Sequence, residues 1–349
     1  AGARLNVTTA PITPGGPGTT TLAGIVPGGR VDCRYVNKPA PATLAITKAF
    51  DDTVPEGFGD TEFSGAYTCT LNSTTVASGT WSITGAGPAS LTPAEGSPAA
   101  DQIPAGASCS ATENPLTGNA GLPDASWEWG TATIDSAVTV ASGQTATITV
   151  TNMAERVYGN FQVTKVIADG STADAELTYS GGWTCTLGAE TVSGSWGPIA
   201  AGTVWQSTDA SKIPLGAACA VSTETRPDWP VADDHSYQWD GDPSFSAAVV
   251  AQSDNLATVT VTNTTKRVLG QVTWTKVAEG SGDQLAGSQW TLAGPGHPAP
   301  GTPVADCLAD PCAGPDLAPA PGAFRIVDLA WGDYTLTETS APPGYELVR

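Results

Sequence analysis

The chain has 349 residues and a formal net charge of −20, from 34 acidic and 14 basic side chains. Nucleic acids and anionic membranes are bound by clusters of Lys and Arg, and the sequence has none, so we expect neither as a partner. Only two histidines occur, which argues against histidine-based catalysis and zinc chemistry. No apolar run reaches the roughly 18 residues needed to span a bilayer, so we expect no membrane insertion.

The composition favours many short strands joined by turns. Gly (40) and Pro (28) are abundant and charged residues make up only 14%, which leaves little material for long helices. At roughly 100–150 residues per domain, the length predicts two to four domains. The only Met is Met153 and the sequence stops after "GYELVR" without a turn, so we expect a fragment of a longer protein.

A repeat organises the chain. Its opening pattern occurs as "LAITKAF" at 44–50, "FQVTKVI" at 161–167 and "VTWTKVA" at 272–278. Its closing pattern occurs as "TATITVTNMAERV" at 145–157 and "LATVTVTNTTKRV" at 256–268. Repeats of this kind are the signature of one structural unit used several times.

The two ends belong to the same series. "GGRVDCRYVN" at 28–37 matches a closing strand, and "QVTWTK" opens a unit whose closing strand is absent. The predicted domains are the C-terminal part of a truncated sandwich at 1–39, whole sandwich repeats at 40–155 and 156–267, and a domain lacking its last strand or strands at 268–349.

The fold class is predicted as all-β. Apolar and polar residues alternate with period two between clusters of Gly, Pro, Asn and Ser, which is typical of half-buried strands. Seven or so such strands per repeat predict an antiparallel β-sandwich of two packed sheets, repeated in an elongated array.

The cysteines pair by position in the repeat. Cys69 and Cys109 stand where Cys185 and Cys219 stand in the next unit, which predicts one disulfide per whole unit and an oxidising, extracytoplasmic setting. Cys307 and Cys312 in "CLADPC" are expected to close a small loop, and Cys33 remains without an assigned partner. The spacing does not fit a metal site.

Each opening strand carries a lysine on its apolar face. In the first unit Leu44, Ile46, Lys48 and Phe50 share that face, since alternate strand residues point the same way. Lys165 and Lys276 occupy the same position in the later units. A buried, unpaired ammonium costs several kcal/mol, so each lysine is expected to shift its pKa or react.

The closing strands place an asparagine on the same kind of face. Asn152, Asn263 and Asn37 occupy equivalent positions. A neutral, desolvated lysine amine is a nucleophile, and next to an asparagine carboxamide it can displace ammonia and form an isopeptide bond. The alternative is that a lysine at a strand end extends to solvent and that the asparagine is an ordinary turn residue.

A carboxylic acid would act as the proton shuttle for this reaction. Glu338 shares the apolar face of "YTLTETSAPPGYEL" with Leu336, and Glu113 has the same relation to Cys109. Glu224 is one residue further from its cysteine than Glu113 is, which puts it on the opposite face unless a β-bulge corrects the register. The acid serving Lys165 is therefore left open.

The segment "YTLTETSAPPGY" at 334–345 closely resembles the E-box of Cna-B-type domains, the stalk modules of Gram-positive collagen adhesins and sortase-built pilins. "VTWTK" with "LAGSQWTL" resembles the opening of those domains, and the two whole units resemble an actinobacterial surface-protein repeat. The resemblance implies transthyretin-like or inverse immunoglobulin-like sandwiches, display outside the cell, and Lys–Asn isopeptide bonds catalysed by Glu or Asp.

Carried onto this sequence, the resemblance matches Lys276 and Glu338 best, with their asparagine outside the chain. The remaining matches are the pairs Lys48–Asn152 and Lys165–Asn263, while Asn37 would react with a lysine outside the chain or in a neighbouring molecule. Sortase signals of the "LPxTG" type are absent from these residues.

Two acidic loops, 51–62 and 233–242, are the candidates for a cation site. Their carboxylates could hold calcium, but neither has an EF-hand spacing, so a solvated loop is the favoured interpretation and no cofactor is expected.

The sequence thus predicts a non-enzymatic extracellular stalk, associated with a cell wall, whose only reaction is its own cross-linking. Two alternatives stay open. One is an adhesin that binds a host or matrix ligand through loops 86–100, 114–125 and 225–242. The other is a covalent filament subunit, in which Asn37 of one copy reacts with Lys276 of the next.

Overall fold

A computed structural model describes residues 6–9, 20–23, 27–30, 32, 40–56, 61–116 and 118–347. Cys33 and Asn37 lie outside these residues, so the predictions about their bonding partners also fall outside the described part of the chain. Within the described ranges the chain is built from strands, and one 3₁₀ turn, Asp209–Ser211, is its sole helical element. No helix in this part of the chain is long and apolar enough to cross a membrane.

The chain divides into two compact units. Among the described residues, the first comprises 6–9, 20–23, 27–30, 32, 40–51, 61–115 and 131–152, and the second comprises 52–56, 116, 118–130 and 153–347. The first unit holds one β-sandwich, called here the first sandwich. The second unit holds the second sandwich, with strands from 162 to 263, and the third sandwich, with strands from 270 to 340.

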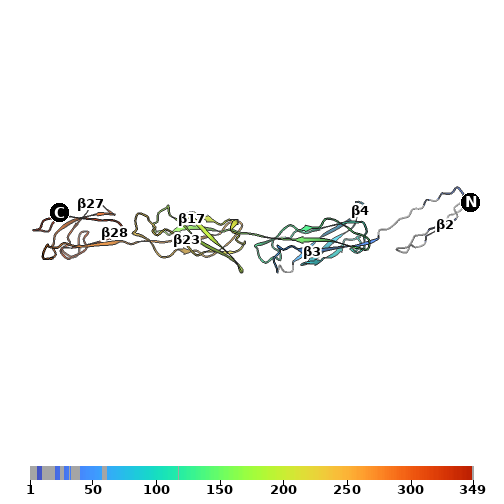
Figure 1. Cartoon of the computed structure of the whole chain (residues 1–349), viewed down its shortest axis with the longest axis horizontal. Coiled ribbons are helices and arrows are strands. Elements are labelled where there is room, and N and C mark those ends of the chain that lie inside the picture. Colours follow the sequence, from blue (N-terminus) through green and yellow to red (C-terminus); the bar gives the residue numbers. More distant parts are fainter. Residues whose placement is uncertain are drawn as a thin grey trace. The chain divides into compact units, whose positions relative to one another are not determined.

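Two five-stranded sheets form the first sandwich, and β3 and β4 belong to opposite sheets (Figure 1). One sheet runs in the order β11 (Thr133–Ile134), β13 (Thr145–Asn152), β3 (Pro41–Phe50) and β6 (Gly87–Pro88), with β8 (Ile103–Pro104) also paired to β3. The other runs in the order β12 (Val138–Thr139), β9 (Ser108–Glu113), β4 (Glu62–Leu71), β5 (Thr74–Thr84) and β7 (Ser90–Pro93).

The second sandwich repeats this plan with two four-stranded sheets. One is β18 (Val204–Gln206), β15 (Gln162–Ile167), β23 (Thr258–Asn263) and β21 (Ser244–Phe245). The other is β17 (Glu190–Ala200), β16 (Thr178–Leu187), β19 (Ala218–Val221) and β22 (Val249–Val250).

The third sandwich has a pair, β25 (Gly270–Thr275) with β28 (Ala323–Leu329), and a triplet, β27 (His297–Ala305), β26 (Gln289–Gly294) and β29 (Thr335–Ser340). Three short ribbons complete the described strands: β1 (Asn6–Thr9) with β2 (Thr20–Ala23), β10 (Trp127–Trp129) with β14 (Ala154–Arg156), and β20 (Tyr237–Trp239) with β24 (Thr265–Arg267). The prediction of an all-β, sandwich-forming chain is confirmed.

The opening and closing strands of both whole repeats pair in parallel, which differs from the purely antiparallel sheets expected from the sequence. β3 pairs with β13 and β15 pairs with β23, with Lys48 opposite Val150 and Lys165 opposite Val261. Parallel neighbours need a long crossover connection, and here all the other strands of the sandwich lie between the two. This register places each asparagine two residues beyond the partner of the lysine.

Every second residue of the central strands points into the core of its sandwich. Along β3, Leu44 and Ile46 are buried, while the residues between them are partly exposed. Lys48 continues the buried series with 1% exposure. Burying aliphatic side chains stabilises the fold by roughly 1.5–3 kcal/mol each. The burial of Leu44 and Ile46 therefore keeps β3 in the sheet, and Lys48 is buried because it lies on the same face of the strand.

A glycine on β4 allows a tryptophan to close the core of the first sandwich. Trp81 is 1% exposed, and its indole Nε1 donates a hydrogen bond of 2.9 Å to the Thr112 carbonyl oxygen. A Cβ on Gly65 would lie 1.9 Å from that oxygen and 2.6 Å from Nε1. Gly181 of the second sandwich has the same relation to Trp196.

Replacing Gly65 by Ala should therefore destabilise the first sandwich by about 2 kcal/mol or more, because both neighbours of the new methyl group are fixed by packing. Urea unfolding followed by tryptophan fluorescence measures the loss. Gly314→Ala is the matched control, since a Cβ there meets open space. Equal stability of the two variants would contradict this account of the indole packing.

Candidate functional site

Lysine, glutamate and asparagine meet in the core of the first sandwich. Lys48 Nζ, from β3, donates to Asn152 Oδ1 at the end of β13 over 2.5 Å and to the Val150 carbonyl oxygen over 3.3 Å. Glu113 Oε1, at the end of β9 in the facing sheet, lies 3.1 Å from the same nitrogen. The two sheets thus bring the three groups together within hydrogen-bonding distance of one amine.

The surroundings of this amine are apolar. Its side chain is 0% exposed, and Nζ lies 4.7 Å from the ring centre of Phe63 and 5.4 Å from that of Phe50. Burial lowers the pKa of Lys48 below its ordinary value, while the charge and hydrogen bond of Glu113 act in the opposite direction. The neutral, nucleophilic form of the amine is therefore more accessible here than in water.

The second sandwich contains an equivalent cluster. Lys165 Nζ, from β15, lies 2.9 Å from Glu224 Oε1, and both side chains are 0% exposed. The nitrogen also donates to the Val261 carbonyl oxygen over 3.3 Å and lies 4.7 Å from the ring centre of Tyr179. Burial lowers the pKa of Lys165, against the raising effect of Glu224.

A shift in register explains how Glu224 reaches this lysine. In the first sandwich β4 and β9 pair without interruption as far as Gly65 and Glu113. In the second, Trp183 pairs with Val221 and Ser180 bridges Thr225. Between these two pairings the chain advances three residues on one side, from 183 to 180, and four on the other, from 221 to 225. The extra residue is a bulge, which returns Glu224 to the core-facing side.

Asn263 carries an unusual feature for a buried amide. It is 0% exposed, and neither its Oδ1 nor its Nδ2 has a hydrogen-bond partner among the described residues. Leaving a buried polar group unpaired costs about 1–3 kcal/mol. A covalent bond from this carboxamide to a lysine would remove part of that cost, because the amide would then have a smaller polar surface to satisfy.

The third sandwich brings together the lysine and acid of the expected third site. Lys276 Nζ donates to Glu338 Oε2, on β29, over 2.9 Å, and the two side chains are 15% and 11% exposed. The asparagine expected for this site was placed outside the chain, and Asn37 lies outside the described residues. Among the described residues, this third site therefore consists of the pair Lys276 and Glu338.

Each sandwich also contains a disulfide at the expected position. The bonded pairs are Cys69–Cys109, Cys185–Cys219 and Cys307–Cys312. The first joins β4 to β9 and the second joins β16 to β19, in both cases directly opposite each other in the ladder. In the two whole repeats the disulfide therefore cross-links one sheet, while the lysine and asparagine lie on strands of the other.

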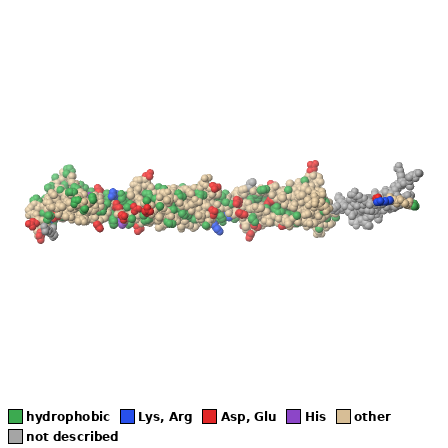
Figure 2. Space-filling model, turned by 90° about the horizontal axis from the view of Figure 1, so that it is seen from above, with side chains coloured by type: hydrophobic (Ala, Val, Ile, Leu, Met, Phe, Trp, Pro, Cys, Tyr) green, Lys and Arg blue, Asp and Glu red, His purple; other side chains and the backbone are tan. Residues whose placement is uncertain are grey.

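The acidic loop 233–242 uses its carboxylates within the protein. Asp234 accepts hydrogen bonds from the backbone N–H and the hydroxyl of Ser236, and Asp240 pairs with Lys266 at 3.2 Å. Among the described residues, no group of three or more His, Cys, Asp or Glu side chains is arranged to hold a metal ion. The outer surface is acidic in character: Figure 2 shows Asp and Glu side chains scattered over the visible face with few Lys or Arg between them.

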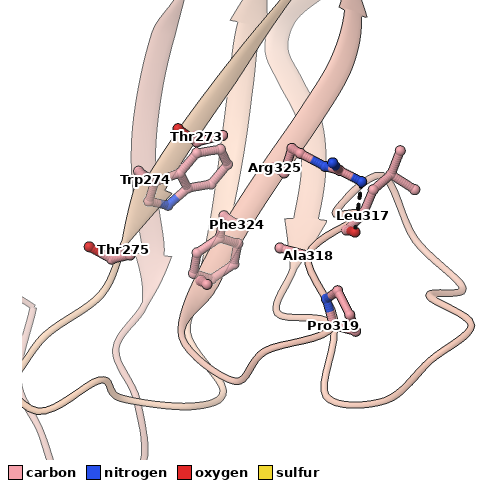
Figure 3. Close-up of a pocket in the computed structure, with 9 residues that line it drawn as sticks. Thr273, Trp274, Thr275, Leu317, Ala318, Pro319, Phe324 and Arg325 are labelled. Carbon is pink, nitrogen blue, oxygen red and sulfur yellow. Dashed lines mark hydrogen bonds between the residues drawn. The ribbon is translucent and has the colours of Figure 1, made fainter.

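A surface hollow in the third sandwich lies beside β25 and β28 (Figure 3). Its lining includes Trp274 and Phe324, whose rings stack at 4.7 Å, and its one charged lining residue is Arg325. The Arg325 guanidinium donates to the Leu317 carbonyl oxygen over 3.5 Å. The lining holds no acid–base pair, so we assign it no chemistry.

The sequence did not point to the aromatic rings that cover the lysines. Phe63 and Tyr179 occupy the same place in the repeat, two residues before Gly65 and Gly181. Their regular recurrence was visible, but only the packing of one sheet on the other shows that they lie over Nζ.

The cluster of the first sandwich contains what an acyl transfer needs, while in the second sandwich the lysine and glutamate are in contact and Asn263 lies buried on the strand beside the lysine without a hydrogen bond to either. The lysine amine is the nucleophile, the asparagine carboxamide is the electrophile, and the glutamate is the group that can move protons between them. All of these side chains are buried, which strengthens the electrostatic effects among them because water is excluded.

Comparison with protein families assigns most of the chain. Residues 44–155 and 161–266 match the family described as "Domain of unknown function (DUF5979)", and residues 270–349 match SpaA, a prealbumin-like fold domain. The first match covers more than half of the chain, so the chain belongs to that family. The second confirms the transthyretin-like fold expected for the C-terminal part and its resemblance to pilin and adhesin modules of the Cna-B type.

Solved structures give weaker similarities, and no curated protein sequence matches. The Bacillus anthracis TIE protein has 17% identity and a TM-score of 0.29, over 87% of this chain and 46% of that one. Two B repeats of the Staphylococcus aureus collagen-binding protein give 14% and 0.24, over 89% and 72%. A Mobiluncus mulieris adhesin containing disulfide, isopeptide and ester cross-links gives 11% and 0.22, over 66% and 100%. This chain spans less than half of the Bacillus anthracis chain, and TM-scores this low carry no argument about function.

The lowered lysine pKa values predict how stability depends on pH when no cross-link is present. In a chain with Asn152→Ala and Asn263→Ala, both lysines remain buried as free amines. Between their lowered folded values and the ordinary value of 10.5, the unfolded chain binds more protons than the folded chain. The free energy of unfolding should therefore rise with pH through that window and be lowest below it.

Urea unfolding at a series of pH values measures this slope. Adding Lys48→Met and Lys165→Met to the same chain provides the control, because it removes the two titrating groups. A slope that persists unchanged in the control would show that other groups cause the pH dependence.

Proposed function

We propose that this protein is an extracellular structural stalk whose whole repeats are locked by autocatalytic Lys–Asn isopeptide bonds. The observation that carries the proposal is the meeting of Lys48 Nζ with Asn152 Oδ1 at 2.5 Å and with Glu113 Oε1 at 3.1 Å in a buried site. The same lysine–glutamate pairing recurs in the second sandwich, and the buried, unpaired amide of Asn263 lies on the neighbouring strand, two residues beyond the residue opposite Lys165.

The proposed reaction balances without a cofactor. The lysine amine attacks the side-chain carbonyl carbon of the asparagine and a new C–N bond forms. The glutamate takes a proton from the attacking amine and returns it to the asparagine nitrogen, which leaves as ammonia when its C–N bond breaks. The products are one secondary amide, one ammonia and the glutamate in its original protonation state.

The position of the bonds suits a mechanical role. Each would join the opening strand of a sandwich to its closing strand, and these two strands are neighbours in one sheet. Tension applied between the ends of a repeat would then pass through covalent bonds instead of through the hydrogen bonds of the parallel ladder. The disulfides favour an oxidising compartment outside the cytoplasm, in agreement with display at a cell surface.

The third sandwich suggests a site for linkage to another segment. Lys276 and Glu338 are already paired, and among the described strands β25 has a neighbour only on its β28 side. A strand carrying an asparagine, added in parallel beside β25, would complete the arrangement seen in the whole repeats. That strand would come from further along the same protein or from a second copy through Asn37, in which case the protein is a covalent filament subunit.

The intact mass of the reduced, denatured chain tests the proposal directly. We expect a deficit of two ammonias relative to the sequence, because each whole repeat would lose one. Lys48→Ala and Lys165→Ala should each restore one ammonia. A mass equal to that of the sequence would overturn the proposal, and the buried lysines would then be tolerated structural residues.

The linkage at Lys276 has a separate test. If Asn37 of one copy reacts with Lys276 of the next, purified assemblies should give a ladder of oligomers on denaturing gels after full reduction. Lys276→Ala and Asn37→Ala should each abolish that ladder while leaving the internal mass deficit intact. Reduced assemblies that run only as single chains would rule out the filament.

A further inference from the structure

The clusters of the two whole repeats differ in their surroundings, although their lysines and glutamates correspond. The nearer of the two rings over Lys48 is Phe63, whereas the corresponding ring over Lys165 is Tyr179, which adds a hydroxyl. Two residues after the glutamate the first sandwich has Pro115, whereas the second has Arg226. The second sandwich thus adds one hydroxyl and one permanent positive charge in the neighbourhood of its lysine–glutamate pair.

Contacts connect Arg226 to the lysine through two aromatic rings. Its guanidinium lies 4.8 Å from the ring centre of Trp239 and donates to the Gly241 carbonyl oxygen over 2.8 Å. Trp239 packs edge-on against Tyr179 with ring centres 6.2 Å apart, and Tyr179 lies against Lys165 Nζ. The arginine is therefore anchored on Trp239, which itself packs against the ring that covers the lysine.

Several buried polar atoms of the second sandwich lack hydrogen-bond partners among the described residues, and two of them belong to the groups that distinguish this cluster from the first. These two are Nη1 of Arg226 and the hydroxyl oxygen of Tyr179, both buried. Buried polar groups are nearly always hydrogen-bonded, so such atoms in a native structure call for an explanation. The contacts with Trp239 and Gly241 explain the position of the Arg226 guanidinium. They do not explain why a positive charge with an unpaired, buried nitrogen lies two residues after Glu224 in the sequence.

We propose that Arg226 is a positioning residue for cross-linking in the second sandwich, where its fixed positive charge favours the neutral amine of Lys165 and so lets this bond form at lower pH than the bond of the first sandwich. The inference rests on the proposed isopeptide chemistry. Arg226 touches neither reacting atom and acts through the electric field at the cluster.

The charges around Lys165 support this direction of effect. Glu224 and Arg226, from the segment after β19, are the charged groups that act on it, and Tyr179 from β16 covers it. Burial lowers the pKa of Lys165 most, Glu224 raises it, and Arg226 lowers it further. Burial and the nearby Glu224 raise the pKa of Tyr179 to about 12, so its hydroxyl stays neutral while the lysine titrates.

The test compares the two sandwiches inside one molecule. Full-length chain recovered unfolded from inclusion bodies is refolded by dilution at a series of values from about pH 5 to about pH 9. Samples are quenched with time and digested, and the cross-linked peptide of each sandwich is quantified by mass. The first sandwich serves as the internal control, and retained disulfides with an unchanged circular dichroism spectrum show that each variant has folded.

Arg226→Met and Arg226→Gln remove the charge, and Arg226→Lys keeps it. We expect both neutral variants to move the pH midpoint of the second bond upward and to slow it by about threefold to tenfold on the acid side, the effect of roughly half to one pKa unit. Arg226→Lys should behave like the parent chain. Tyr179→Phe, which makes the ring match Phe63, should leave the midpoint unchanged.

An unchanged pH profile in the neutral variants, with both bonds still forming, would overturn the role of Arg226. A shift caused by Tyr179→Phe and not by Arg226→Met would overturn it as well. Failure of the parent chain to lose ammonia in either sandwich at any pH would instead refute the proposed cross-linking itself. The two failures are therefore distinguishable in a single data set.

Discussion

The burial of a lysine amine between two sheets is the constraint on which each whole repeat depends. Removing an ammonium from water costs several kcal/mol, and removing one partner from a buried charged pair is strongly destabilising. Lys48 meets Glu113 at 3.1 Å and Lys165 meets Glu224 at 2.9 Å, so each charge is compensated from the facing sheet. The pairing links the two halves of each sandwich, because Glu113 comes from β9 of the sheet facing Lys48 and Glu224 comes from the segment that follows β19 of the sheet facing Lys165.

The two repeats reach this arrangement by different local routes. A continuous ladder places Glu113, whereas a bulge of one residue places Glu224. The energetic penalty of an unpaired buried lysine is larger than that of disturbing a few ladder hydrogen bonds at the end of a strand, so the backbone yields to the charge pair. The same reasoning explains why sequence spacing varies here while the buried contact does not.

Covalent reinforcement is divided between the sheets of each whole repeat. The disulfide joins neighbouring strands of one sheet, and the proposed isopeptide bond joins the opening and closing strands of the other. Disulfides constrain the unfolded chain and depend on the redox environment, whereas an amide bond does not depend on it. A repeat locked in both ways would keep its strands together under reducing conditions and under load.

The sequence by itself determined the all-β class, the phase of the repeat, the three disulfide pairs and the placement of each lysine on a core-facing position, since all of these follow from period-two alternation and from equivalent positions in a repeat. It did not determine that the opening and closing strands run parallel, because the pairing of strands about a hundred residues apart is decided by the packing of the whole sandwich. It left the position of Glu224 open for the same reason, since a bulge is stabilised by contacts across the sheets. The rings of Phe63 and Tyr179 and the charge of Arg226 were also visible as letters, but only the tertiary structure sets them around the amine, where distance and exclusion of water give them their effect.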